Sequence, residues 1–443
     1  MRADIRIAWT LARGSERRER WRFALTLLGA LLATGFALAA ATVAAVSGQV
    51  SIPYAHGLLN QPGERAGVVL TLVLLLIPVL GFLGQCARIG AVHRHRRTAG
   101  MRLAGASPAQ VRRIAAVESA FACLAGSSLG LAAFAVVLAV AGHTPPPVAW
   151  AGFVVVVLAV PLIAALVSVF ALRHVVASPL DHVRRTDSDR GRRAALGSLL
   201  AAVLIATAGL LFLLPAGKGM TPFALLVLGL VLLTGAGAVW VAGAFAAFMG
   251  RRLTLRAKSP AVLVAASRLA HDPWAAARTH AALLLVTVVG VGFVGVRGVL
   301  LAALGEDGYR PVDLAFYTTG IDLAGAAVLV AVAISLCGIA VGTAESLATR
   351  RRGLAAQAAA GVPYGVLARA TLLETALPLA PALLLAGAGG TVVYAAYATV
   401  VGGPVPLLPL LVPVAVYTAC LLAAATSLPL LRRVAHPAEL RFT

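Results

Sequence analysis

The chain has 443 residues, of which 60% are hydrophobic and 12% charged, and its formal net charge is +21. A soluble domain needs roughly 25% charged residues to cover its surface, so this composition excludes a water-soluble globular protein and predicts an integral membrane protein. The four cysteines are far apart and lie within or at the ends of apolar runs, so their spacing indicates neither a disulfide framework nor a metal site.

Ten apolar runs are long enough to cross a membrane, since about 20 apolar residues span about 30 Å of hydrocarbon. The predicted spans are Phe23–Val46, Gly67–Cys86, Ile114–Val140, Val148–Leu172, Ala194–Pro215, Pro222–Met249, Ala281–Leu304, Phe316–Val341, Leu372–Tyr397 and Leu407–Leu431. The predicted fold class is therefore all-α, with about ten transmembrane helices.

The runs group into a four, two, four arrangement. An interfacial amphipathic helix is predicted at 1–22, a first four-span module at 23–193, a two-span insert at 194–249 and a second four-span module at 250–443. The modules contain the basic connectors 87–113 and 342–369, and a lead-in helix is predicted at 261–280. Neither module has a large domain outside the membrane, because Gly305 to Ala315 is a short loop.

Basic residues predict the orientation of the chain. With the N-terminus inside, 33 of the 37 Lys and Arg residues fall on the cytoplasmic side, and only Arg65, Lys218, Arg297 and Arg310 lie outside. The positive-inside rule thus accounts for the charge without nucleic acid. It predicts a multi-pass plasma-membrane protein with both termini and both connectors in the cytoplasm.

One connector sequence occurs twice, 256 positions apart. The segment "RHRRTAGMRLAGASPAQVRRIAAVE" from Arg94 to Glu118 recurs as "RRRGLAAQAAAGVPYGVLARATLLE" from Arg350 to Glu374. Arg, Gly and Glu match at equivalent places, as in Gly105 with Gly361 and Glu118 with Glu374. A duplicated membrane module is therefore predicted.

Charges near the apolar runs are the other candidate site residues. Glu118 and Glu374 are predicted about one turn into their spans, where we expect them to anchor the connectors rather than carry protons. Arg297 and Asp322 are predicted near the outer boundary, either paired between two spans or simply extended toward water.

The first connector and the segment after it, "GMRLAGASPAQVRRIAAVESAFACLAGSSLG", resemble the FtsX-like, or MacB-like, permease family of ABC transporters. In that family the connector is a coupling helix, a cytoplasmic helix that docks on a separate ATPase subunit. The resemblance implies this role for Arg97, Met101, Arg102, Leu103, Gly105, Ser107, Pro108, Arg112 and Arg113, and for Arg352, Gly361, Pro363 and Arg369. The second copy departs from the pattern, because Ala358 replaces Arg102 and Pro363 replaces Ser107.

The resemblance implies a permease subunit that exports or extracts a hydrophobic or amphipathic substrate. Its partners would be membrane lipid and a cytoplasmic ABC ATPase in two copies. No cofactor is expected in this chain, because the nearest phosphate-loop string, "PAGKGMT" around Lys218, lacks the first glycine; ATP would be bound by the partner, and the chain would not itself be an enzyme. The alternatives are a signalling subunit that transmits ATPase motion without cargo and, third, a secondary transporter, which would need ionisable residues near the membrane midplane.

Overall fold

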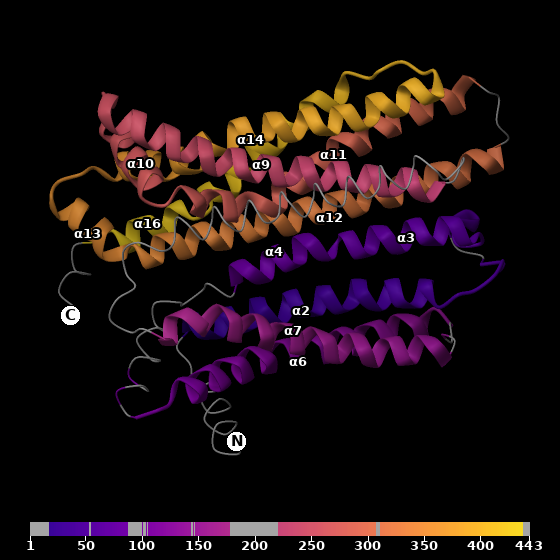
Figure 1. Cartoon of the computed structure of the whole chain (residues 1–443), viewed down its shortest axis with the longest axis horizontal. Coiled ribbons are helices and arrows are strands. Elements are labelled where there is room, and N and C mark those ends of the chain that lie inside the picture. The colour runs from indigo at the N-terminus through magenta and orange to yellow at the C-terminus, as the bar shows by residue number, and fades with distance from the viewer. Residues whose placement is uncertain are drawn as a thin grey trace. The chain divides into compact units, whose positions relative to one another are not determined.

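The computed structural model describes residues 17–52, 55–86, 105–142, 147–177, 220–306 and 311–436, together with residues 100, 103 and 145. Every regular element in these ranges is helical (Figure 1). Eight of the helical segments are long and apolar enough to cross a membrane. The prediction of an all-α, multi-pass membrane protein is confirmed for this part of the chain. The predicted fifth span, Ala194–Pro215, lies outside the described residues.

The chain divides into two compact units, residues 1–184 with 315–327, and residues 185–314 with 328–443. The first unit contains α2 (Arg17–Ala44), the 3-10 turn η1 (Ala55–Gly57), α3 (Pro62–Leu74), α4 (Leu76–Cys86), α6 (Pro108–Val140) and α7 (Pro147–Ala177). The second contains α9 (Met220–Arg256), α10 (Pro260–His271), α11 (Pro273–Glu306), most of α12 (Pro311–Thr349), α13 (Arg351–Ala359), α14 (Tyr364–Val401), η2 (Leu408–Leu411), α15 (Val412–Ala425) and α16 (Leu428–Val434).

Small residues bring α2 and α6 together in the first unit. A methyl group added at Gly126 would meet the Leu27 carbonyl and the Ala30 side chain. The Thr34 hydroxyl donates a hydrogen bond of 3.0 Å to Ser127 in the same interface, where both side chains are fully buried. Close approach at glycine and interhelical hydrogen bonds are the usual means of packing helices in lipid, which adds no hydrophobic driving force of its own.

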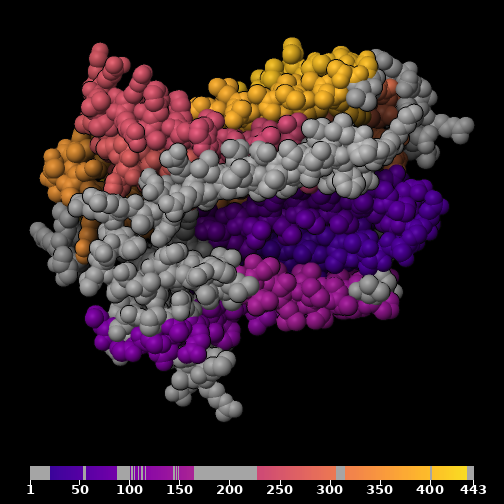
Figure 2. Space-filling model, viewed as in Figure 1, coloured from indigo at the N-terminus to yellow at the C-terminus, as the bar shows by residue number. Residues whose placement is uncertain are grey.

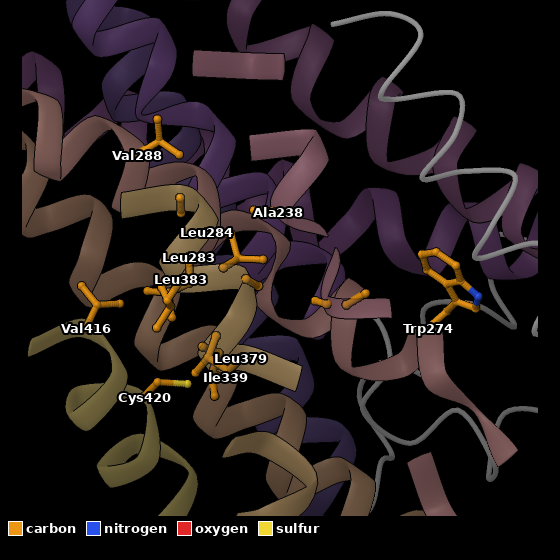
Figure 3. Close-up of a cluster of buried hydrophobic side chains, with 14 residues drawn as sticks. Ala238, Trp274, Leu283, Leu284, Val288, Ile339, Leu379, Leu383, Val416 and Cys420 are labelled. Carbon is orange, nitrogen blue, oxygen red and sulfur yellow. The ribbon is translucent and has the colours of Figure 1, made fainter. Parts of the chain in front are cut away.

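The second unit packs around a larger apolar cluster formed by α9, α11, α12, α14 and α15. Figure 3 shows Leu283 and Leu284 of α11 beside Leu379 and Leu383 of α14, with Trp274 at one end of the cluster. Gly243 of α9 allows this indole to lie against its backbone, since an added Cβ would overlap the ring. Glycine thus permits close helix packing in both units, at Gly126 in the first and at Gly243 in the second.

Proline sets several helix boundaries that differ from the predicted ones. The lead-in helix 261–280 is wrong as a single element, because α10 ends at His271 and α11 begins at Pro273. Asp272 precedes the proline, and its carboxylate accepts a hydrogen bond of 3.1 Å from the Ala275 amide. This aspartate stops one helix and caps the next.

Two predicted spans are interrupted for the same reason. The last span, Leu407–Leu431, breaks between α15 and α16, where Pro429 cannot donate the backbone hydrogen bond that a continuous helix needs. The second span breaks at Leu75, between α3 and α4, shortly before Pro78.

Two other helices are longer than predicted. Helix α12 continues to Thr349, so the first eight residues of the connector 342–369 are helical and belong to α12. Arg17–Arg22 likewise begin the span helix α2.

Candidate functional site

Both connectors end with the same backbone geometry. Gly105 and Gly361, which are 256 positions apart, have φ of 91° and 87°. Two residues later the N-caps Ser107 and Pro363 are both extended, with ψ of 154° and 145°, and each begins a long helix. Residues with a Cβ rarely adopt positive φ, so glycine is required at both turns. The matching conformations support an equivalent structural role for the two copies.

The N-cap chemistry explains where α6 begins. The Ser107 hydroxyl accepts a hydrogen bond of 3.2 Å from the Gln110 amide, and the Gln110 side chain accepts one of 2.8 Å from the Ser107 amide. This capping box satisfies two of the backbone N–H groups left free at a helix start, and Pro108 fits the first turn because it has no N–H to satisfy. Pro363 occupies the equivalent place at α14 without a side-chain cap.

The second connector contains a short helix, α13, with two different faces. Leu354 is 1% exposed and Ala355 is fully buried. Arg352, Ala356 and Ala359, spaced four and three residues apart, are exposed on the other side. Leu354 packs into a cluster with Leu347 of α12, Leu367 of α14, and Leu431 and Val434 of α16. The helix is therefore fixed to three neighbouring helices by one face, and its other face is exposed.

A carboxylate lies 11 residues beyond each N-cap and is paired with arginine; Glu118 is buried and Glu374 is partly buried. Glu118 is 6% exposed and forms an ion pair with Arg22 of α2. Arg350 donates to Oε1 and Oε2 of Glu374 at 2.6 and 2.9 Å, and Arg268 of α10 lies 3.4 Å from the same Oε2. Arg350 directly precedes α13, so Glu374 joins the connector, α10 and α14.

Burial lowers the pKa of Arg268, and the nearby charge of Glu374 acts in the opposite direction and raises it. Arg350 adds to the lowering, since two guanidinium groups share one carboxylate. The Arg268 charge is kept in a poorly solvated place by its acidic partner.

Buried positions follow the same register in α6 and α14. Cys123 and Leu379, Gly126 and Ala382, and Gly130 and Ala386 are equivalent under the shift of 256 and are all buried. The exposed residues between them, such as Leu129 and Leu385, are equivalent too. The repeat in the sequence thus corresponds to a repeat in which helix face is covered.

The remaining predicted site residues fall into three groups. Leu103 is 90% exposed, and Arg113, Arg369, Arg297 and Asp322 are exposed as well. Pro108 and Arg112 lie in the first turns of α6. Arg97, Met101 and Arg102 are outside the described residues. Over the described ranges, no group of three His, Cys, Asp or Glu residues is arranged to hold a metal ion.

Sequence reasoning missed the basic partners Arg22 and Arg268. They lie 96 and 106 residues from their glutamates, and a single sequence contains no signal that joins them. It also missed Tyr364, whose hydroxyl donates a hydrogen bond of 2.8 Å to the Leu428 carbonyl at the start of α16. Arg432 lies over the same ring, 4.9 Å from its centre.

Residues 68–180 match the family model of the FtsX-like permease C-terminal domain. The chain carries an FtsX-like permease domain. The match contains the first connector and the helices α4, α6 and α7, so it confirms the resemblance read from the first copy; the second copy lies outside it. A comparison with curated proteins gave no match. FtsX-like permeases are membrane subunits that typically pair with an ABC ATPase.

Proposed function

We propose that this protein is the transmembrane subunit of an ABC transporter. It couples ATP hydrolysis on a separate cytoplasmic ATPase to export or extraction of a hydrophobic or amphipathic substrate. The observation that carries the proposal is the FtsX-like match over 68–180, because it includes the connector between α4 and α6. ATP would be bound by the partner subunit alone.

Features of the second connector support docking of an ATPase subunit at both connectors. Its turn at Gly361 has the same conformation as that at Gly105, and α13 presents Arg352, Ala356 and Ala359 outward. A docking helix needs both an exposed face for its partner and a fixed attachment to the spans that it moves. The cluster around Leu354 and the pairing of Glu374 with Arg350 provide that attachment.

The equivalent burial of α6 and α14 supports a chain that holds both permease modules. On this basis we propose ten spans in a four, two, four arrangement, with both termini in the cytoplasm of the plasma membrane. One chain would then bind two ATPase subunits. The absence of a large loop between α11, which ends at Glu306, and α12, which begins at Pro311, favours a substrate taken from the bilayer over delivery by an outer domain.

Co-purification tests the proposal. The chain is solubilised gently from its native membranes, and any ATPase bound to it is measured for the wild type, Leu103→Glu and Ala356→Trp. Both changes alter exposed connector residues and leave the packed face intact. Ala380→Trp is the matched control, because it adds the same ring to an exposed position of α14 away from the connector.

The ATPase should accompany the wild type and the control, and its recovery should fall at least tenfold with either connector variant. If no ATPase is recovered with the wild type, even after chemical cross-linking, the transporter proposal is wrong.

A further inference from the structure

The last turns of α9 carry a face that the coupling mechanism leaves unused. Phe248, Arg251, Arg252 and Leu255 follow the spacing i, i+3, i+4 and i+7, which places them on one side of the helix. All four are exposed, Phe248 at 46% and Leu255 at 87%. On the opposite side Gly250 lies against the backbone of α10 at Leu269 and Ala270. The exposed face is therefore directed away from α10.

Helix length places this face at the membrane surface. The 37 residues of α9 extend about 55 Å, well beyond the roughly 30 Å of hydrocarbon. From Met220 to Met249 the helix has no charged residue, and Arg251 and Arg252 are the first charges after that run. They lie within one turn of the end of the apolar stretch, which is the depth of lipid phosphates.

The same side of α9 continues into the apolar part of the helix. Trp240, 40% exposed, lies two helical turns before Phe248. An exposed tryptophan and phenylalanine on a membrane-spanning helix contact lipid rather than a water-soluble partner. The basic turn is thus continuous with a lipid-facing surface.

Charge and geometry both fit an anionic headgroup. Arg256 and Lys258 follow within six residues of Arg252 and are also exposed, and no acidic residue occurs between Met220 and His271. The Arg252 guanidinium lies 4.7 Å from the centre of the Phe248 ring, which orients it along the helix. Guanidinium groups bind phosphate oxygens with two parallel hydrogen bonds.

We propose that this turn of α9 binds the headgroup of an anionic phospholipid of the cytoplasmic leaflet, with Arg251 and Arg252 on the phosphate and Phe248 and Leu255 among the upper acyl carbons. The inference depends on the orientation given in the proposed function, which puts this end of α9 in the cytoplasm. Figure 2 shows this part of α9 at the surface, at the same end of the second unit as α13. A lipid bound here would contact the α9–α10 hairpin, whose Arg268 is paired with Glu374.

Lipid titration of the intact purified chain tests the site. Dioleoylphosphatidylglycerol and dioleoylphosphatidylcholine are added in detergent, and the bound lipids are counted by native mass spectrometry. Each basic residue near an anionic surface contributes about a fivefold gain in affinity, so Arg251→Gln with Arg252→Gln should weaken phosphatidylglycerol binding about 25-fold. Phosphatidylcholine binding should be unchanged.

Arg351→Gln with Arg352→Gln is the matched control, since it removes another adjacent arginine pair from the same end of the unit. It should keep phosphatidylglycerol binding and lose the ATPase. The α9 pair should do the reverse, and its thermal unfolding midpoint should match the wild type.

Three results would overturn the lipid site. Equal loss of phosphatidylglycerol with both pairs would indicate general attraction to a basic surface. No loss with the α9 pair would leave the site without support. Loss of the ATPase with the α9 pair, at unchanged phosphatidylglycerol binding, would identify a protein-docking face. That last result would refute the lipid site and leave the transporter proposal intact. Conversely, loss of phosphatidylglycerol binding with the α9 pair, when no ATPase accompanies the wild type, would support the lipid site and refute the transporter proposal.

Discussion

The cluster of Arg268, Arg350 and Glu374 predicts an unequal response to loss of its members. Glu374→Gln removes the only acid among the three and leaves two guanidinium groups facing each other. The Arg268 side chain is 14% exposed, so its charge would lose its partner in a poorly solvated place. Breaking a fully buried pair costs about 3–5 kcal/mol. Because Glu374 is 19% and Arg350 34% exposed, we expect about 2 kcal/mol for Glu374→Gln.

Arg268→Gln should cost less, about 1 kcal/mol, since Glu374 keeps its two contacts with Arg350. The assay is equilibrium unfolding of the chain in mixed detergent micelles, followed by tryptophan fluorescence. Asp322→Asn makes the same chemical change at an exposed carboxylate, where solvent screening limits any ion pair to at most about 1 kcal/mol, so it should cost less than Glu374→Gln. An effect of Glu374→Gln no larger than that of Asp322→Asn, or smaller than that of Arg268→Gln, would refute this account of the cluster.

Three further changes test other parts of the structure. Gly126→Ala should destabilise the first unit by about 1–3 kcal/mol in the same unfolding assay, because the new Cβ overlaps Leu27 and Ala30. Gly35→Ala in α2 is the control; its Cβ meets no atom, so it should be neutral or stabilising by up to about 1 kcal/mol. Gly361→Ala should cost about 1–2 kcal/mol because of its φ of 87°, although no atom lies near the new Cβ. Gly353→Ala, within α13, also has open space but lies in a helix, so it should not lower the stability. A similar loss of stability in both variants would contradict the backbone explanation. Leu354→Ala should cost about 2–5 kcal/mol and expose the connector to limited proteolysis, while cleavage as slow as in the wild type would show that the cluster around Leu354 does not fix α13.

Much of the fold could be predicted from the sequence because membrane helices have a recognisable length and composition. Long uncharged runs mark the spans, and the glycines of α6 mark its contact with α2, since only small residues permit that approach. The connector turns were predictable for a similar local reason, as glycine followed two residues later by Ser107 or Pro363 is a helix-start pattern.

The errors arose where a short signal lies inside a long pattern. The Asp272–Pro273 dipeptide divides a segment whose composition is helical throughout. Pro429 interrupts the helix of the last span, although the span itself is present at Leu408–Val434. The partners of Glu118 and Glu374 were beyond reach for another reason. A partly or fully buried carboxylate needs a basic partner, but the sequence contains many arginines that could serve. Packing selects Arg22 in the first unit and Arg268 with Arg350 in the second.

That selection reveals a difference between two copies that are otherwise alike. Arg22 and Arg278 hold the same register, 256 positions apart, yet Arg22 pairs with Glu118 while Arg278 pairs with Asp272 at 3.1 Å. Because Arg278 is paired with Asp272 at the α10–α11 junction, Glu374 pairs with Arg350 and Arg268 instead. The carboxylate of the first unit therefore ties α6 to α2, and that of the second ties α14 to Arg350 at the start of α13 and to α10. The second connector is therefore joined to α14 twice, by the ion pair of Arg350 with Glu374 and by the packing of Leu354 against Leu367.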